Sequence, residues 1–219
     1  MESSIKYIPP QKGIEIERVA EEAVGSPDSI PLLFDGVNNK KGAIRFGCEK
    51  VIRLISEDRP EIIYPYFDKI VFLLESDNNI LKWGAIIILS NLASVDTENK
   101  FEKIFKKYFA PIKGKQMITA SNIVKNAWKI ALAKPFLVER VTREILKAER
   151  TEYENKGELS PECNRIVCGH AIDSFSRYYE KIKNKKPVKD FIKRQIDNPR
   201  SAVAKKAEKF AMKYKIEHA

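Results

Sequence analysis

The chain has 219 residues, and its 40 lysines and arginines outnumber its 30 aspartates and glutamates, so the formal net charge is +10 at pH 7. Hydrophobic residues make up 43% of the sequence, which is enough to bury a continuous core and excludes a disordered chain. The 9 glycines and 11 prolines are too few for a turn-rich all-β protein, and 32% charged residues suits helices with solvated faces. We therefore expect an all-α fold.

Three cysteines, Cys48, Cys163 and Cys168, cannot close a disulfide framework, and the N-terminus lacks the charged and then apolar order of a secretory signal. The longest apolar run, around 83–89, is far shorter than the roughly 20 residues that cross a bilayer. These features predict an intracellular, cytoplasmic protein that does not span a membrane.

The first predicted helix lies near the N-terminus, where Ile14, Ile16, Val19, Ala20 and Ala23 fall at helical spacing and form its inner side. The acidic residues between them then face solvent. A short helix over 27–37 follows.

The most informative segment is 77–93, a polar turn that opens into a helix apolar nearly all round. A helix of this kind has no solvent face, so it is buried between neighbouring helices. Looser copies of the pattern recur along the chain, which indicates a stack of repeated helix pairs.

In the C-terminal half, an apolar stripe steps by three and four residues through Phe101, Phe105, Tyr108 and Ile112, as one buried helix face requires. A later helix begins at Ser160-Pro161-Glu162, where serine is a preferred cap and proline suits the first helical position. We interpret 150–160 as a surface loop inserted between repeats.

Small residues mark where each first helix of a pair approaches its neighbour closely. Aligned on these residues, the helix pairs follow one another at roughly the length of a two-helix repeat. The anchors are Ala43, Ala85, Ala120, Ala171 and Ala204.

The pattern resembles HEAT repeats of the armadillo/HEAT superfamily, whose repeats open with an acidic turn followed by apolar, basic and small residues. The best match comprises Asp77, Leu81, Lys82, Ala85, Ile86, Leu89 and Leu92. Partial matches comprise Asn39, Gly42, Ala43, Ile44, Gly47, Val51 and Ile52 near the N-terminus and Asp197, Arg200, Ala204, Ala207 and Phe210 near the C-terminus. The copies around Ala120 and Ala171 lack the acidic turn.

The resemblance implies a single domain over 1–219, a right-handed α-solenoid of about five HEAT-like helix pairs with an insertion near 150–160. First helices would form its convex side and second helices its concave side. The second helices would be 60–75, 98–112, 135–150 and 187–196, preceded by a short one at 27–37.

Positive charge is concentrated in two segments, since 100–150 and 181–219 each carry a net +9, whereas 1–99 carries −5 and 151–180 carries −3. Nine basic residues fall on the predicted second helices of the C-terminal half. This basic strip comprises Lys103, Lys106, Lys107, Arg140, Arg143, Lys147, Lys189, Lys193 and Arg194. Such a strip would attract phosphates or an acidic protein. The alternative is that these residues only solvate helix faces, and Glu139 and Glu144 dilute the middle group.

The sequence contains no motif that indicates catalysis, a cofactor or a metal. Cys163, Cys168 and His170 lie within one helix, but the two cysteines point about 140° apart, so core packing is favoured over zinc binding. Trp83 and Trp128 are expected in the core of first helices. An aromatic contact patch near 64–67 is a further interpretation.

Two functions remain open. The preferred one is a non-catalytic scaffold that binds an acidic partner protein through the concave face, as the resemblance implies. The other is a nucleic-acid-binding protein similar to the HEAT-like alkylpurine DNA glycosylases, which would use the basic groove against the DNA backbone. A glycosylase would need an aromatic residue and an acid inside the groove, and both tryptophans are assigned to first helices.

Overall fold

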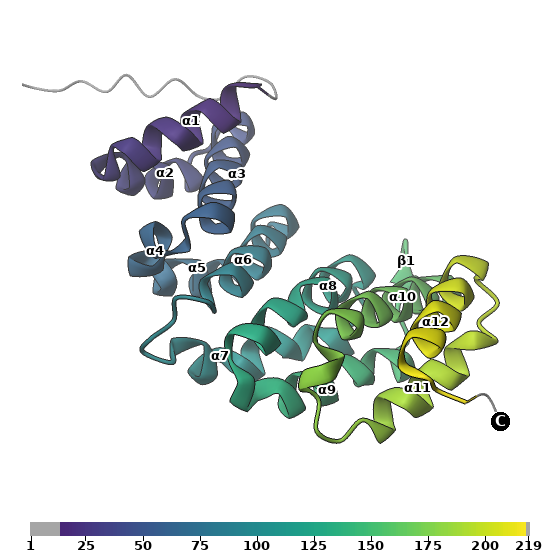
Figure 1. Cartoon of the computed structure of the whole chain (residues 1–219). Coiled ribbons are helices and arrows are strands. Elements are labelled where there is room, and N and C mark those ends of the chain that lie inside the picture. Colours follow the sequence, from purple (N-terminus) through teal and green to yellow (C-terminus); the bar gives the residue numbers. More distant parts are fainter. Residues whose placement is uncertain (1–13, 218–219) are drawn as a thin grey trace, which may run out of the picture. The chain divides into compact units, whose positions relative to one another are not determined.

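The computed structural model describes residues 14–217. The described chain is helical apart from one short hairpin, as the sequence predicts (Figure 1). Its contacts divide it into two compact units, one ending at Val95 and the other beginning at Asp96.

The first unit is built of α-helices and 3-10 turns. Its elements are α1 (Ile14–Gly25), η1 (Pro27–Ser29), α2 (Ile30–Val37), α3 (Gly42–Asp58), α4 (Pro60–Ile63), η2 (Tyr64–Tyr66), α5 (Phe67–Leu73) and α6 (Asn79–Leu92). Helix α3 packs against α1, α2 and α6. The predicted inner side of α1 is confirmed at Ile16, Ala20 and Ala23, which are buried.

Helix α6 is the segment that the sequence marks as apolar nearly all round. Nine of its twelve residues from Leu81 onwards are buried, and the other three are half-buried. The helix begins where the side chain of Asn78 accepts hydrogen bonds from the backbone N–H groups of Ile80 and Leu81, at 3.0 and 3.4 Å. Inside the unit, Asn91 Nδ2 donates to Ser56 Oγ at 2.9 Å, a buried bond that joins α6 to α3.

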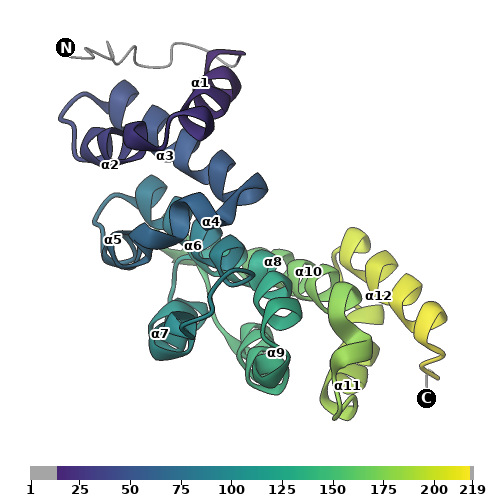
Figure 2. The same ribbon diagram turned by 60° about the vertical axis from the view of Figure 1, so that its left-hand side comes forward.

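The second unit contains three first helices and three second helices. Its elements are α7 (Lys100–Phe109), η3 (Ala110–Lys113), α8 (Met117–Ala133), η4 (Pro135–Leu137), α9 (Val138–Leu146), η5 (Lys147–Arg150), β1 (Glu154–Asn155), β2 (Glu158–Leu159), α10 (Pro161–Tyr178), η6 (Tyr179–Lys181), α11 (Lys186–Ile196) and α12 (Ser201–Tyr214). Helices α8, α10 and α12 pack side by side in one layer (Figures 1 and 2). Helices α7, α9 and α11 belong to the other layer.

The stripe that predicts α7 is confirmed, because Phe101, Phe105, Tyr108 and Ile112 are all buried. Helix α9 is tied to α10 by a buried contact of 3.2 Å between Thr142 Oγ1 and Tyr178 Oη. Within the second unit, α9 and α11 make few contacts with each other, whereas the first helices pack closely.

The close-approach residues are confirmed for the three central pairs, since Ala85, Ala120 and Ala171 are buried. The prediction is wrong at Ala43, which is exposed, and Ala204 is only half-buried. The buried small residue lies one turn later in both helices, at Gly47 and Ala207.

The insertion at 150–160 is a β-hairpin rather than an irregular loop. Its two strands pair antiparallel, with Glu154 opposite Leu159. Lys156 and Gly157 at the turn both have positive φ, as a two-residue hairpin turn requires. The hairpin is attached to the helices by Tyr153, whose buried hydroxyl donates to the Ile112 carbonyl oxygen at 2.8 Å.

Helix α10 begins at Pro161, as predicted, but the side chain of Ser160 forms no capping hydrogen bond. Instead, the Ser160 N–H closes the hairpin by donating to the Tyr153 carbonyl at 2.8 Å. The Ser160 carbonyl accepts from the N–H of Cys163 at 3.0 Å. The start of the helix is therefore fixed by the backbone.

Within residues 14–217, none of the helices combines the length and the apolar character that crossing a bilayer requires.

Candidate binding clefts between second helices

The nine residues of the basic strip all lie on the second-helix layer of the unit that begins at Asp96. On α7, Lys103, Lys106 and Lys107 are exposed, on the side away from the buried aromatic stripe. On α11, Lys189 and Arg194 are exposed and Lys193 is half-buried.

The middle group belongs to α9 and to the first residue of η5. Arg143 is exposed, whereas Arg140 and Lys147 are half-buried. The predicted association of the nine residues with second helices thus agrees with the element positions in this unit.

Ion pairs with carboxylates already engage Arg140, Lys147 and Arg194 of the strip. Arg140 Nη1 lies 3.1 Å from Glu102 Oε1, and its guanidinium carbon lies 4.3 Å from the centre of the Phe105 ring. Lys147 Nζ donates to both carboxylate oxygens of Glu144, at 2.5 Å. These pairs reduce the positive charge that the layer offers to a partner.

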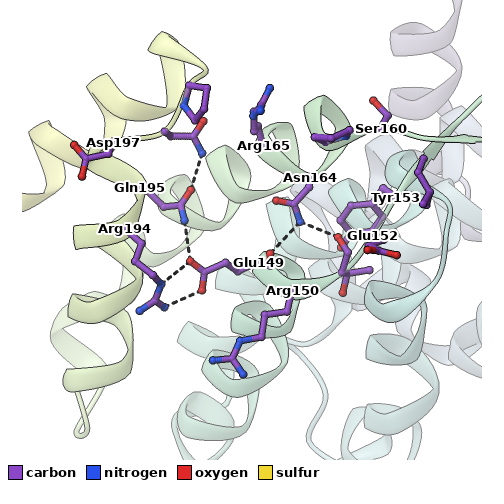
Figure 3. A pocket seen from close by; sticks show the side chains of 15 residues that line it. Glu149, Arg150, Glu152, Tyr153, Ser160, Asn164, Arg165, Arg194, Gln195 and Asp197 are labelled. Carbon is purple, nitrogen blue, oxygen red and sulfur yellow. Dashed lines mark hydrogen bonds and ion pairs between the residues drawn. The ribbon is translucent and has the colours of Figure 1, made fainter.

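Arg194 forms the most extended of these pairs. Its Nε and Nη2 atoms donate to the two oxygens of Glu149 at 2.9 and 2.8 Å, so the pair is bidentate (Figure 3). Gln195 Nε2 donates to Glu149 Oε1 at 2.9 Å. Helix α11 is thereby fastened to η5, and this attachment holds together the walls of two adjoining clefts.

A cleft of about 480 Å³, which we call the basic cleft, lies between α9–η5 and α11. Five cationic residues line it, together with two acidic ones. These residues are Arg143, Lys147, Arg150, Lys186, Arg194, Glu149 and Asp190. The structure therefore brings three residues of the basic strip together here, Arg143, Lys147 and Arg194, while the other six do not line this cleft.

A second cleft of about 560 Å³, the hairpin cleft, adjoins the first and shares Glu149, Arg150 and Arg194 with it. Figure 3 shows its wall around Asn164 and Gln195. Its charged residues balance, with three arginines and three acids, and the remainder of its lining is polar or moderately apolar.

Asn164 fixes the backbone that the two clefts share. Its Nδ2 atom lies 2.8 Å from the carbonyl oxygens of Ala148 and Thr151 and 3.2 Å from that of Glu149. These carbonyls lie at the end of η5 and just after it, where helical hydrogen bonds run out, and the asparagine gives each of them a side-chain donor. The backbone on both sides of Arg150 is consequently held in place.

Comparison with known proteins supports this view of the fold. No protein-family model and no curated protein matches the sequence. Solved structures do match, and one is an engineered protein from the Northeast Structural Genomics Consortium, with a TM-score of 0.52 and 13% identity over 92% of this chain and 89% of that one.

A chain of the Pds5-Scc1 complex matches with a TM-score of 0.57 and 12% identity, over 95% of this chain but only 34% of its own length. A designed armadillo repeat protein matches less closely, with a TM-score of 0.46 and 15% identity over 90% of this chain and 91% of that one. The chain has an armadillo/HEAT-like α-solenoid fold. At these identities the likeness concerns the fold alone.

Within this armadillo/HEAT-like fold, sequence reasoning missed Arg150 and Lys186 as members of the basic cleft. Arg150 falls at the predicted edge of the insertion, although it follows Arg143 and Lys147 at seven and three residues, which is one face of a helical segment. Lys186 is the first residue of α11, one position before the predicted start of that helix at 187. The role of Glu149 as the partner of Arg194 has no local sequence signal, because the two residues are 45 positions apart.

Of the aromatic residues that suggest a contact patch near 64–67, Phe67 is not accessible to a partner, whereas Tyr64 and Tyr66 are half-buried. Phe67 is buried, and Tyr66 stacks on Phe34 with ring centres 4.7 Å apart. In the other unit, Trp128 is half-buried on the first helix α8, and the guanidinium of Arg177 lies 4.4 Å from the centre of its ring. Trp83 is also only half-buried, so neither tryptophan lies fully within the core.

Both cysteines of α10, Cys163 and Cys168, are buried in the core, as the sequence predicts. Burial raises the pKa of the Cys168 thiol to about 12, and burial also lowers the pKa of His170. Among residues 14–217, no group of three or more histidine, cysteine, aspartate or glutamate side chains is arranged to hold a metal ion.

We expect all three native thiols to resist Ellman's reagent, because Cys48 is buried too and thiolates are the reactive species. The chain unfolded in urea should be labelled fully in the same time. A Ser176→Cys variant, with its new thiol exposed on α10, provides the control. Native labelling of Cys168 as fast as that of the introduced cysteine would contradict the buried placement.

Proposed function

We propose that this chain is a non-catalytic interaction module that binds an acidic partner protein through the second-helix layer α7, α9 and α11. The observation that carries the proposal is the basic cleft, where three residues of the basic strip meet two further cations on facing helices. A cleft between two walls can bury a polypeptide segment, whereas scattered surface lysines cannot. One chain of similar fold comes from a protein complex, which agrees with this proposal.

The charge pattern favours a polypeptide over a nucleic acid as the partner. Carboxylates alternate with the cations on the same layer, at Glu102, Glu144, Glu149 and Asp190. The uniformly negative phosphate backbone of a duplex would meet these carboxylates at close range, and like charges in contact are unfavourable. A protein segment can place neutral or basic groups beside them.

The alternative similar to DNA glycosylases has less support. It requires an aromatic residue and an acid in the groove, but Trp128 lies on the first helix α8 and its ring is covered by Arg177. Duplex binding therefore serves as the competing outcome in the test.

The test compares a labelled acidic peptide in which glutamates alternate with neutral residues, which we call polyglutamate, with a random DNA duplex at low and moderate salt. The variant Lys106→Glu, Arg143→Glu, Lys193→Glu changes one residue on each second helix. We expect it to weaken polyglutamate binding by roughly a hundred-fold, since three charge reversals act on one ligand. Anisotropy titrations measure both affinities.

The matched control is Lys125→Glu, Lys205→Glu, Lys209→Glu, which changes the net charge equally with three exposed residues of the first helices α8 and α12. Its affinity for polyglutamate should fall only modestly, and circular dichroism should show that both variants are folded. Equal losses of affinity in the two variants would show that the second-helix layer is not the binding surface. Duplex binding that is tighter than polyglutamate binding and falls steeply with salt would favour the nucleic-acid alternative.

A further inference from the structure

The cations of the basic cleft are neutralised unequally. Arg194 is paired with Glu149, Lys186 Nζ lies 2.8 Å from Asp190 Oδ2, and Lys147 is paired with Glu144. Each of these carboxylates thus neutralises one cation. Among the described residues, Arg143 and Arg150 are the two cations of the cleft that have no carboxylate within ion-pair distance.

The two arginines occupy one ridge. Arg143 is in the last turns of α9, and Arg150 ends η5, with Lys147 between them at the helical spacing that keeps all three on one side. Arg143 and Arg150 are both exposed, so their guanidinium groups are accessible from solvent. In Figure 3 the side chain of Arg150 extends past Glu149 rather than pairing with it.

The surrounding contacts keep Arg150 available. Its sequence neighbour Glu149 is engaged by Arg194 and Gln195 on α11, and only 16% of that carboxylate side chain is exposed. Asn164 holds the carbonyls on both sides of Arg150 through its bonds to Glu149 and Thr151. The backbone that carries Arg150 is therefore held in place, which reduces the backbone ordering that ligand binding would require.

We propose that Arg143 and Arg150 bind a phosphorylated serine or threonine of the partner segment in the basic cleft. The proposal deepens the proposed function and rests on it, because it names the chemical group that the acidic partner presents there.

Charge favours a phosphoryl group over a carboxylate. Two unneutralised guanidiniums require two negative charges, and a phosphoserine carries about −1.5 to −2 at neutral pH in a single group. Its three oxygens can accept paired N–H bonds from planar guanidiniums, which a single carboxylate can do for one arginine at a time. A cleft of about 480 Å³ also leaves room for the residues that flank the phosphoryl group.

The experiment uses short labelled acidic peptides that are identical except at the central residue, which is phosphoserine, glutamate or serine. Titrations of the full chain are made at constant ionic strength. We expect the phosphoserine peptide to bind roughly ten-fold more tightly than the glutamate peptide, because charge-assisted bonds to a dianion are added. Arg143→Gln and Arg150→Gln should each remove most of that advantage, and the double variant should lose little more than either single one.

A pH series distinguishes binding of the phosphoryl group from binding of the glutamate carboxylate. The second ionisation of a phosphoserine has a pKa of about 6, whereas glutamate titrates near 4.3. Lowering the pH from about 7 to about 5 protonates the phosphoryl group once while arginine keeps its charge, so the phosphoserine peptide should weaken and the glutamate peptide should hardly change.

The matched control is Lys209→Gln, which removes one positive charge from an exposed position on α12, outside both clefts. Its affinity for the phosphoserine peptide should stay within a factor of about two. Equal binding of the phosphoserine and glutamate peptides would overturn the inference, and so would equal losses in Lys209→Gln and Arg150→Gln. The polyglutamate titration tests the proposed function separately, so a positive result there with equal peptides would reject only the phosphoryl group.

Discussion

Replacing Asp96 with alanine is expected to destabilise the second unit by about 3–5 kcal/mol, because the buried Lys134 keeps its hydrogen bond to Asn99 Oδ1 but loses the carboxylate that neutralises its charge. Asp96 Oδ2 lies 3.1 Å from Lys134 Nζ, and the exposed fractions of the two side chains are 0% and 7%. Asp96 Oδ1 and Oδ2 also accept hydrogen bonds from the N–H groups of Lys100 and Phe101 at 2.8 and 3.0 Å. The carboxylate therefore caps the start of α7 as well.

Urea denaturation followed by circular dichroism measures this loss. The matched control is Glu98→Ala, which removes an exposed carboxylate two residues away, 3.5 Å from Lys100 Nζ, and should cost less than about 0.5 kcal/mol. Lys134→Met should cost less than Asp96→Ala, since the carboxylate can still cap α7 while an apolar chain fills the space of the lysine. A loss in Asp96→Ala no larger than that in Glu98→Ala would contradict the buried pair.

Gly84→Ala is expected to destabilise the first unit by about 1–3 kcal/mol, against the usual trend for a helix. Alanine in a helix interior normally improves stability by about 1 kcal/mol over glycine. At this position, however, an added Cβ would lie within 2.9 Å of Glu49 Cγ and closer still to the carboxyl group of Glu49. Glu49 is buried and paired with Arg53 at 3.2 Å, so it cannot move aside without breaking that pair.

A double change separates crowding from other effects. Adding Glu49→Ala to Gly84→Ala should recover part of the loss, because the side chain that meets the new methyl group is gone. Gly25→Ala is the control, since an added Cβ at the end of α1 would have nothing within 4 Å and no loss is expected. Additive losses in the double variant would rule out contact between the two side chains as the cause.

The helices could be predicted from sequence because their signals are local. The stripe from Phe101 to Ile112 contains its own period, and Pro161 marks a helix start without reference to any distant residue. The burial of α6 also follows from its composition alone. At the two ends of the repeat series, sequence alone does not show which small residue is buried, because Ala43 and Ala204 each have a second small residue one turn later.

The geometry of the clefts could not be predicted in the same way. The sequence predicts the basic strip from the faces of single helices. Whether a cation is paired depends instead on contacts between distant residues, such as Arg140 with Glu102 or Arg194 with Glu149. Sequence spacing carries no information on these distances. The same reason kept Arg150 out of the predicted site, because it lies at the border of an insertion whose hairpin becomes visible only in three dimensions.

Hydrogen bonds hold the base of the hairpin, whereas its turn is exposed to solvent. Tyr153 bonds to Ile112, and Asn164 secures the segment just before β1, while Lys156 and Gly157 are exposed at the turn. We therefore expect a change at the turn to leave the segment that carries Arg150 in place. The turn is a suitable place to attach a fluorophore or an affinity handle that reports on the clefts without occupying them.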